Sequence, residues 1–225
     1  MKKHYAVIGL GRFGYSVAKT LAKYGSEVIA IDSQEERVNK VSDFVAYAVQ
    51  LDAMDEKALR SVGVQNVDTA IVSIGENIEA NILVVMILKE MGIKSIIAKA
   101  VTTLHGKVLE NLGVHRIVYP ERDMAIRVAH SLIRPSVLEQ LDLSEEYSIL
   151  ELPTPQHLIG KTIADSQLRS RYGVNLIAIK RKVTTDKGII KESWNVNPLP
   201  SDIMREGDVL VLIGLNEDLD KLGIE

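Results

Sequence analysis

Three glycines and one aspartate near the amino end have the residue types and spacing of a phosphate-binding turn. Residues 5–14 read Tyr-Ala-Val-Ile-Gly-Leu-Gly-Arg-Phe-Gly, and Asp32 ends the next apolar run. Gly9 permits a tight turn, Gly11 lets the backbone approach a pyrophosphate, and Gly14 lets a helix pack close to a sheet. The first helical amides would then face phosphates, and the carboxylate would bind ribose hydroxyls. The pattern predicts a nucleotide site, with a glycine-rich structural turn as the alternative.

Arg12 and Phe13 stand inside this motif. A guanidinium at Arg12 adds a forked cation to an amide-rich anion site, although the helix dipole opposes a cation at that end. This unfavourable placement favours an anion nearby, on the same or a neighbouring subunit. The alternative is an exposed arginine at a helix start. Asp32 is followed by Ser-Gln-Glu-Glu, with no arginine directly after it, so we expect its carboxylate to disfavour the 2′-phosphate of NADP.

Four further candidate residues follow later strands. Asp52 overlooks the adenine end of the expected site, or serves as a cap or loop acid for a helix starting near Asp55. Gly75 and Asn77 line the cleft, or form a simple strand-to-helix turn. Glu121 begins a helix, where the dipole alone favours an acid. Its alternative role is to face a phosphate-bound cation, because hard cations take carboxylate and phosphate oxygens.

Alternating β-rich and helical patterns must position these residues. We expect strands at 4–9, 27–31, 45–49, 68–73, 95–100 and 115–119, with helices near 12–24, 34–42, 55–61, 77–91 and 103–112. Such alternation predicts an α/β fold with a doubly wound parallel sheet. The order 3-2-1-4-5-6 places the ligand above strands 1 and 4.

The pattern changes after residue 120. We expect a helix at 121–133, a short helical continuation at 136–141 and a domain boundary near 140–144. The strands beyond it are predicted at 146–152, 174–181, 193–197 and 208–214, with one helix at about 162–169. The sequence therefore predicts a dinucleotide-binding (Rossmann) domain at 1–140 and a smaller α+β lobe at 141–225. This lobe is too small for the substrate domain of a typical dehydrogenase.

Composition narrows the function further. The chain has 225 residues, a net charge of −3 and no cysteine, so we expect neither a nucleic-acid partner nor thiolate chemistry. The longest pure apolar run, 82–88, has 7 residues, against about 20 for a membrane-crossing helix. Any membrane role is therefore expected to come through a partner. The helix at 77–91 is apolar around most of its circumference, which indicates a subunit contact or a long core helix.

Four segments in order resemble a known family: GLGRFG followed by Asp32, then SIGENIEAN, YPERDMA and DLSEEYSILEL. The whole chain resembles the cytoplasmic regulatory subunits of bacterial Ktr/Trk potassium-uptake systems, which carry RCK (regulator of potassium conductance) domains. The resemblance implies an RCK_N and an RCK_C lobe, homodimers assembling into an octameric ring, and a membrane-embedded potassium-translocating partner. The subunit would be peripheral on the inner face of the membrane and would not be an enzyme.

The resemblance also implies ligands and their residues. ATP and ADP compete in this family, and NAD or NADH binds some members, at the positions of Gly9, Gly11, Gly14 and Asp32. Arg12 resembles the residue that meets the terminal phosphate of a nucleotide on the adjacent subunit, and Glu121 resembles the acid beside a cation site.

The second lobe carries a further resemblance. The segment LRSRYGVNLIAIKR, with Arg169, Asn175 and Ile177, resembles the region where family members bind cyclic di-AMP at a dimer interface. The loop at 186–200 is longer than the family pattern leads us to expect.

Two other functions are weighed against a nucleotide-sensing gating subunit. An NAD-dependent oxidoreductase needs a proton donor near the nicotinamide, and His105 and Lys99 lie near the end of the fifth strand. A redox-sensing DNA-binding repressor needs a basic recognition helix, and the sequence contains no clear one.

Overall fold

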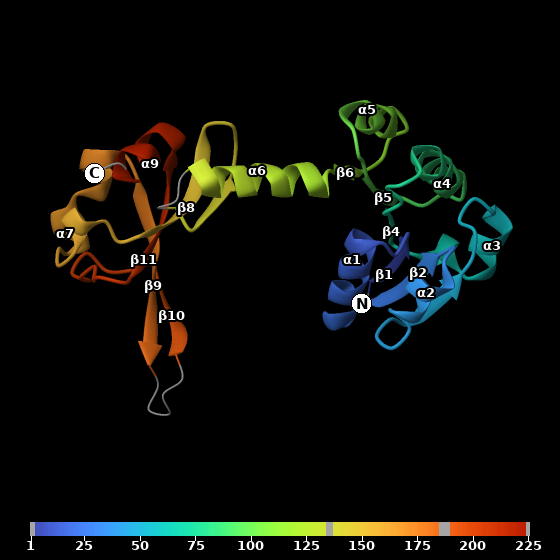
Figure 1. Cartoon of the computed structure of the whole chain (residues 1–225), viewed down its shortest axis with the longest axis horizontal. Coiled ribbons are helices and arrows are strands. Elements are labelled where there is room, and N and C mark those ends of the chain that lie inside the picture. Colours follow the sequence, from blue (N-terminus) through green and yellow to red (C-terminus); the bar gives the residue numbers. More distant parts are fainter. Residues whose placement is uncertain (1–2, 134–136, 185–189, 224–225) are drawn as a thin grey trace. The chain divides into compact units, whose positions relative to one another are not determined.

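The computed structural model describes residues 3–133, 137–184 and 190–223 (Figure 1). The chain divides into two compact units, Met1–Asp123 and Met124–Glu225. The division falls inside helix α6 (Pro120–Ile133), earlier than the boundary expected near 140–144. The later part of α6 is tied to the second unit, because Arg127 Nη2 lies 2.6 Å from Glu139 Oε1.

The first unit is built on a parallel sheet with the order β3-β2-β1-β4-β5-β6, which confirms the predicted fold and strand order. Its strands are β1 (His4–Ile8), β2 (Glu27–Asp32), β3 (Tyr47–Gln50), β4 (Thr69–Val72), β5 (Ser95–Lys99) and β6 (Arg116–Val118). Ile8 is opposite both Ile31 and Val72 in the register. The central strands therefore end at the same edge of the sheet, where the loops that follow them converge.

Helices cover both faces of this sheet because strand side chains alternate between the faces. Val7 packs into the core that contains Ala18 of α1 (Arg12–Lys23), with α2 (Glu35–Asn39) on the same side. Ile8 packs into the opposite core. That core also takes side chains from α3 (Glu56–Ser61), η1 (Val64–Asn66), α4 (Ile78–Glu90) and α5 (Thr103–Asn111).

Helix α4 is more apolar than one core contact requires. Val84, Val85 and Leu88 are fully buried, whereas Leu83 and Met86 are exposed. The exposure of these two side chains agrees with the sequence, in which this helix is apolar around most of its circumference. A subunit contact at this surface stays a prediction. None of the helices in the described residues has the length and hydrophobicity to cross a bilayer.

The second unit holds an antiparallel sheet with the order β10-β9-β11-β8-β7. Its strands are β7 (Glu139–Asp142), β8 (Tyr147–Pro153), β9 (Asn175–Thr184), β10 (Ile190–Val196) and β11 (Val209–Leu215). Short helices accompany it: η2 (Gln156–Leu158), α7 (Ile163–Ser166), α8 (Leu168–Tyr172) and α9 (Asn216–Gly223). The core of this unit joins β8, β9 and β11 to these helices through leucines such as Leu150, Leu212 and Leu219.

Two local predictions in this unit were wrong, and one helix was missed. The helical continuation at 136–141 is strand β7 over its described part from Glu139, because Leu141 pairs antiparallel with Ile149; residue 136 lies outside the described residues. The helix at 162–169 is broken in two by Gln167, whose φ of 51° is left-handed. Helix α9 was not predicted, and its Leu219 and Leu222 fill the core.

One ion pair joins strand β9 to the turn that precedes β11. Asp208 is 1% exposed and accepts hydrogen bonds of 2.6 Å from both Nε and Nη2 of Arg181, and one of 2.9 Å from the Arg205 amide. Burial raises the pKa of Asp208, but the bonds from Arg181 and Arg205 outweigh it and hold the pKa below its ordinary value. This carboxylate therefore stabilises the folded unit only while it is ionised.

We expect Asp208→Asn to reduce the free energy of unfolding of the second unit by about 2–3 kcal/mol, because an amide presents donors to the guanidinium. The contribution of Asp208 is complete above the unfolded pKa of about 3.9 and is lost as pH falls through the lower folded pKa. Urea unfolding at several pH values measures this, with the exposed Glu206→Gln as control. Equal stability of the two variants at neutral pH would contradict the assignment.

Candidate nucleotide-binding site

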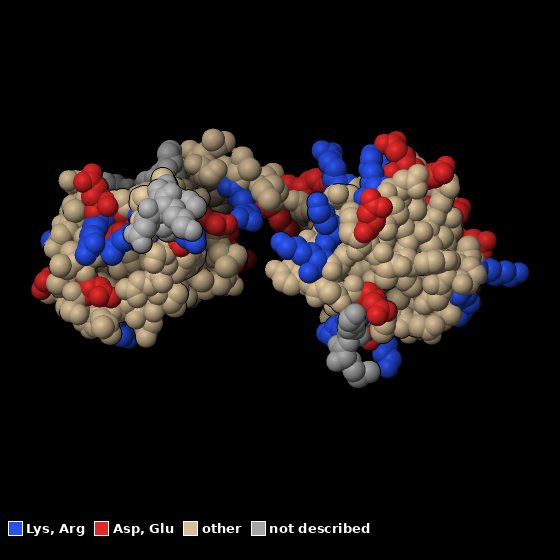
Figure 2. All heavy atoms as spheres, turned by 90° about the horizontal axis from the view of Figure 1, so that it is seen from below, with Lys and Arg blue, Asp and Glu red and all other residues tan. Residues whose placement is uncertain are grey.

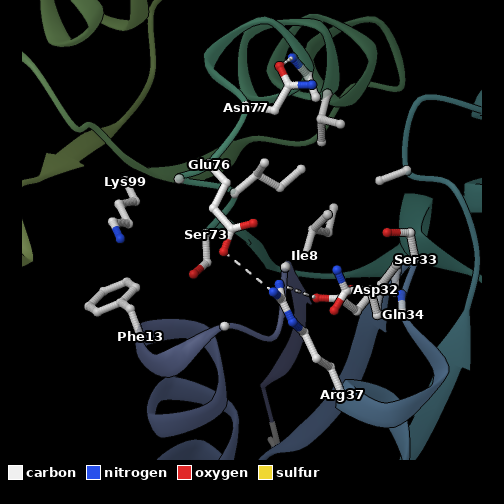
Figure 3. Close-up of a pocket in the computed structure, with 18 of the residues that line it drawn as sticks. Ile8, Phe13, Asp32, Ser33, Gln34, Arg37, Ser73, Glu76, Asn77 and Lys99 are labelled. Atoms are coloured by element: carbon white, nitrogen blue, oxygen red, sulfur yellow. Dashed lines mark hydrogen bonds and ion pairs between the residues drawn. The ribbon is translucent and has the colours of Figure 1, made fainter.

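A cavity of about 660 Å³ opens at the carboxyl ends of β1, β2, β4 and β5 (Figure 3). The lining includes nine of the residues singled out from the sequence: Gly9, Gly11, Arg12, Phe13, Asp32, Asp52, Gly75, Asn77 and Glu121. Gly14 is buried at the start of α1. Residues spread over more than a hundred positions of the chain are therefore brought together by the sheet topology.

The glycines of the turn have different physical roles. Gly9 has φ +90°, and a Cβ there would lie 3.0 Å from the Ile74 amide nitrogen. A Cβ on Gly14 would collide with the carbonyl oxygen of Gly9. Gly11 has an ordinary φ of −63°, and its Cβ would meet only the far end of Arg37, at 4.0 Å. Gly9 and Gly14 are therefore required by the fold, whereas Gly11 leaves open space on the cavity side.

The amino end of α1 is available to an anion. Among the described residues, no side chain caps this helix and no acid stands in its first turn. By contrast, Asp55, Asn77 and Thr102 cap α3, α4 and α5 with side-chain oxygens. The free amides at this end and the dipole of α1 make an anion site.

Ser73, which directly follows β4, also indicates a ligand site at the glycine turn. Its hydroxyl is buried and has no hydrogen-bond partner among the described residues. The oxygen would lie 3.0 Å from a Cβ on Gly14, so it sits under the glycine turn. A buried polar atom without a partner is rare in folded proteins and requires an explanation. A ligand or a water held by a ligand at the turn supplies one.

Asp32 is held rigidly at the other side of the cavity (Figure 3). One carboxylate oxygen accepts from the Leu10 amide at 2.6 Å, and the other accepts from the Gln34 amide at 2.9 Å. The residue is 6% exposed. These bonds aim the carboxylate and tie β2 to the glycine turn, which suits an anchor for ribose hydroxyls.

Arg37 was missed by the sequence reasoning. Its Nη1 lies 3.7 Å from Asp32 Oδ2, and its Nη2 lies 3.4 Å from Glu76 Oε1 (Figure 3). Residues 33–36 contain no cation, as the sequence shows, but helix α2 places Arg37 beside Asp32. An arginine is therefore near this carboxylate, and the expectation that Asp32 disfavours NADP stays a prediction.

Asp52 and Asn77 have structural partners as well as cavity positions. Asp52 Oδ1 accepts from the Met54 amide at 2.9 Å, while Asp55 is the cap of α3. Asn77 Oδ1 accepts from the Ala80 amide at 3.0 Å and caps α4. The loop and turn alternatives are thus present in the fold, and roles in binding remain predictions.

Charged groups gather at the far side of the cavity from Asp32. Lys99 Nζ donates to Glu121 Oε1 at 2.6 Å. This hydrogen bond is the main reason that the pKa of Glu121 lies below its ordinary value, and the charge of Arg12 also lowers it. The Arg12 side chain is exposed and makes no hydrogen bond or ion pair among the described residues.

A buried network joins the two loops on this side. Asn81, fully buried, donates to the carbonyl oxygens of Ile74 at 2.7 Å and Lys99 at 3.2 Å. Its own oxygen lies 3.3 Å from His105 Nε2, and His105 Nδ1 accepts from the Val101 amide at 3.4 Å. Burial lowers the pKa of His105, so the ring is neutral and serves this network.

The predicted cyclic di-AMP residues lie in the second unit. Arg169 is exposed on α8, Asn175 is exposed at the start of β9, and Ile177 is half-buried and accepts from the Asn197 amide at 2.9 Å. Residues 186–189 of the long loop lie outside the described residues, and 190–196 form β10 rather than a loop.

We expect Gly14→Ala and Gly11→Ala to separate folding from binding. Gly14→Ala overpacks a backbone contact and costs about 2–3 kcal/mol or more in unfolding free energy. Gly11→Ala keeps or slightly raises stability, by up to about 1 kcal/mol, but blocks the approach of phosphates. Urea unfolding and calorimetric titration with ADP measure the two effects. Unchanged ADP affinity in Gly11→Ala would contradict the phosphate role of the turn.

Comparisons with known proteins agree with this geometry. A model of the TrkA-N domain matches residues 5–120, and a model of the TrkA-C domain matches residues 147–223. Ktr system potassium uptake protein C of Bacillus subtilis is 44% identical over 221 residues, 98% of this chain and 96% of its own length. Ktr system potassium uptake protein A of Vibrio alginolyticus is 35% identical over 217 residues, 96% and 94% of the two chains.

Solved structures resemble the fold. The GsuK RCK domain has a TM-score of 0.56 and 27% identity, and the match covers 97% of this chain and 45% of that one. The GsuK channel has a TM-score of 0.68 and 19% identity, with 100% and 40% covered, which shows the fold alone. This chain thus spans less than half the length of either. The matches to Ktr proteins over nearly the whole chain, together with the matches to both domain models, show that this chain belongs to the family of Ktr system potassium uptake proteins.

Proposed function

We propose that the chain is a nucleotide-sensing gating subunit, switched by ATP against ADP. As a Ktr system potassium uptake protein, it would be the cytoplasmic regulatory subunit, paired with a membrane-embedded potassium-translocating subunit. The observation that carries the proposal is the uncapped amino end of α1 facing a cavity, with Asp32 held across from it. An adenine nucleotide fits this arrangement, with its ribose on Asp32 and its phosphates on the glycine turn.

A switch between ATP and ADP needs a contact at the one phosphate by which they differ. A ligand shifts a conformational equilibrium only through its differential affinity for the two states. Arg12 has an exposed guanidinium without a side-chain partner among the described residues, so it is free to take that phosphate. The phosphate would belong to a nucleotide on the same or the adjacent subunit, and ring expansion would be the output.

NAD or NADH would use the same turn and the same carboxylate. Of the two candidate proton donors of the oxidoreductase alternative, His105 is bonded to Asn81 and Val101, and Lys99 forms an ion pair with Glu121. In a gating subunit, bound dinucleotide would act as a regulator rather than as a hydride carrier.

A cation near the phosphates is proposed only together with a phosphate ligand. Among the described residues, no cluster of three His, Asp or Glu side chains could hold a metal ion. Glu121 supplies a single carboxylate, which already forms an ion pair with Lys99. The described residues of one chain therefore offer no such cluster, and phosphate oxygens would have to supply the remaining ligands.

Assembly into homodimers and an octameric ring on the membrane-embedded partner is part of the same proposal. Exposed apolar side chains support it: Leu83 and Met86 on α4, and Met124 and Leu132 on α6, which buries no residue in one chain. On the face drawn in Figure 2, acidic and basic side chains are interspersed, and a broad area of the first unit, on the right, carries neither.

Cyclic di-AMP is proposed as a second ligand, at the dimer interface of the second unit. Arg169 on α8 and Asn175 on β9 are both exposed, and only two residues separate the two elements.

We expect Arg169→Ala to reduce the affinity for cyclic di-AMP about tenfold, because the variant lacks a cation that would face a phosphate. The affinity for ADP should stay unchanged. Calorimetry measures both ligands, with Arg171→Ala as the neighbouring control. Equal losses in the two variants would count against a specific site.

We expect Arg12→Ala to narrow the affinity difference between ATP and ADP by about tenfold, while ADP still binds. Calorimetric titration of both nucleotides measures the ratio of their affinities. The control is Arg60→Ala on α3, since Arg60 forms an ion pair with Glu56 and does not line the cavity. An unchanged ratio would refute the role of Arg12. Absence of adenine nucleotide binding in the unmodified protein, or turnover of a nucleotide at an enzyme's rate, would refute the proposed function.

A further inference from the structure

The ion pair between Lys99 and Glu121 is strongly asymmetric. The two atoms are 2.6 Å apart, but the Lys99 side chain is 12% exposed and the Glu121 side chain is 69% exposed. Lys99 ends β5 inside the sheet, whereas Glu121 stands in the first turn of α6. One partner is thus enclosed by the protein, and the other is largely in water.

The surroundings hold Lys99 where it is. Its carbonyl oxygen accepts from Asn81 at 3.2 Å, and its strand pairs with β4 and β6. Its ammonium lies against the bare face of Gly75, where an added Cβ would come within 3.0 Å of Nζ. Lys99 therefore cannot follow Glu121 outward if the helix moves.

The two ions differ in what they lose on separation. An enclosed ammonium without a partner is costly, because burial removes water from the charge. An exposed carboxylate in the first turn of a helix is hydrated and is stabilised by the helix dipole. Lys99 therefore needs an anion at all times, while Glu121 does not need Lys99.

The cavity supplies the place for a second anion. Lys99, Glu121 and the glycine turn line the same cavity. Figure 3 shows Lys99 on the side of Phe13, away from Asp32 and Arg37. A nucleotide anchored by its ribose at Asp32 would extend its phosphates past the turn toward Lys99.

We propose that Lys99 is a phosphate-binding residue that exchanges Glu121 for the outer phosphates of a bound nucleotide and thereby frees the first turn of α6. This inference rests on the proposed function and deepens it. It assigns the ligand class as nucleoside diphosphates and triphosphates or dinucleotides, rather than monophosphates. Arg12 has no hydrogen-bonded or ion-paired partner to give up within the described part of the chain, whereas Lys99 couples phosphate binding to the release of a helix.

The exchange predicts opposite effects for the two partners. Lys99→Gln is expected to reduce the affinity for ADP about tenfold and the affinity for AMP less than about twofold. Glu121→Gln is expected to raise the affinity for ADP about threefold, because the competing carboxylate is gone. In the double variant, the gain from Glu121→Gln should vanish, because no lysine is left to be released.

Calorimetry on the full-length protein in EDTA measures these affinities without metal ions. The exposed pair of Glu56 and Arg60 on α3 is the matched control, and Glu56→Gln should leave ADP affinity unchanged. Circular dichroism checks the fold of Lys99→Gln. The Glu121→Gln arm does not depend on that check, because Glu121 is exposed.

Hydrogen exchange supplies a second readout. ADP should speed amide exchange at Asp123, whose amide donates to the Tyr119 carbonyl, and at Met124 in the unmodified protein. Glu121→Gln should show fast exchange at both amides with or without ADP.

The outcomes are distinguishable. If both single variants weaken ADP, or neither changes it, the pair is only structural and the exchange is refuted. If the gain from Glu121→Gln persists without Lys99, Glu121 acts by direct repulsion of phosphate and the exchange is also refuted. If the unmodified protein binds no adenine nucleotide, the proposed function fails and the exchange fails with it.

Discussion

The close packing of α1 against the turn after β1 is the constraint on which the site depends. A side chain at Gly14 would collide with the Gly9 carbonyl, so the helix can begin at that distance only with glycine there. This approach aims the first amides of α1 at the cavity and encloses the Ser73 hydroxyl beneath the turn. The same packing that completes the core therefore creates the anion site, and folding and binding share one set of atoms.

The two sides of the cavity differ in mechanical character. Asp32 is fixed by two backbone amides, so a ligand bound there finds a preformed anchor and moves little. Lys99 is enclosed, but its partner Glu121 is exposed at a helix start. Under the proposed function, the anchor would give affinity for any adenosine, and exchange of the ion pair would make the response depend on the phosphates.

Local patterns were predictable, and distant partners were not. Gly14 and Asp32 could be assigned from spacing, because a strand, a turn and a helix have fixed lengths and the sheet order follows from alternation. Arg37 was missed because one turn of helix brings it back to Asp32. Asn81 was missed because its partners lie 7, 18 and 24 positions away. Strand β7 was mistaken for helix because four residues carry little periodic signal and its pairing partner decides its conformation.

Asn81 has one more consequence for the cavity. Its amide group donates to the backbone carbonyls of both Ile74 and Lys99. The loops after β4 and β5 are therefore coupled through one side chain. A compound designed to wedge open one loop would have to displace the other as well. An inhibitor that needs only one of these loops to move would therefore bind poorly, because the two loops resist displacement together.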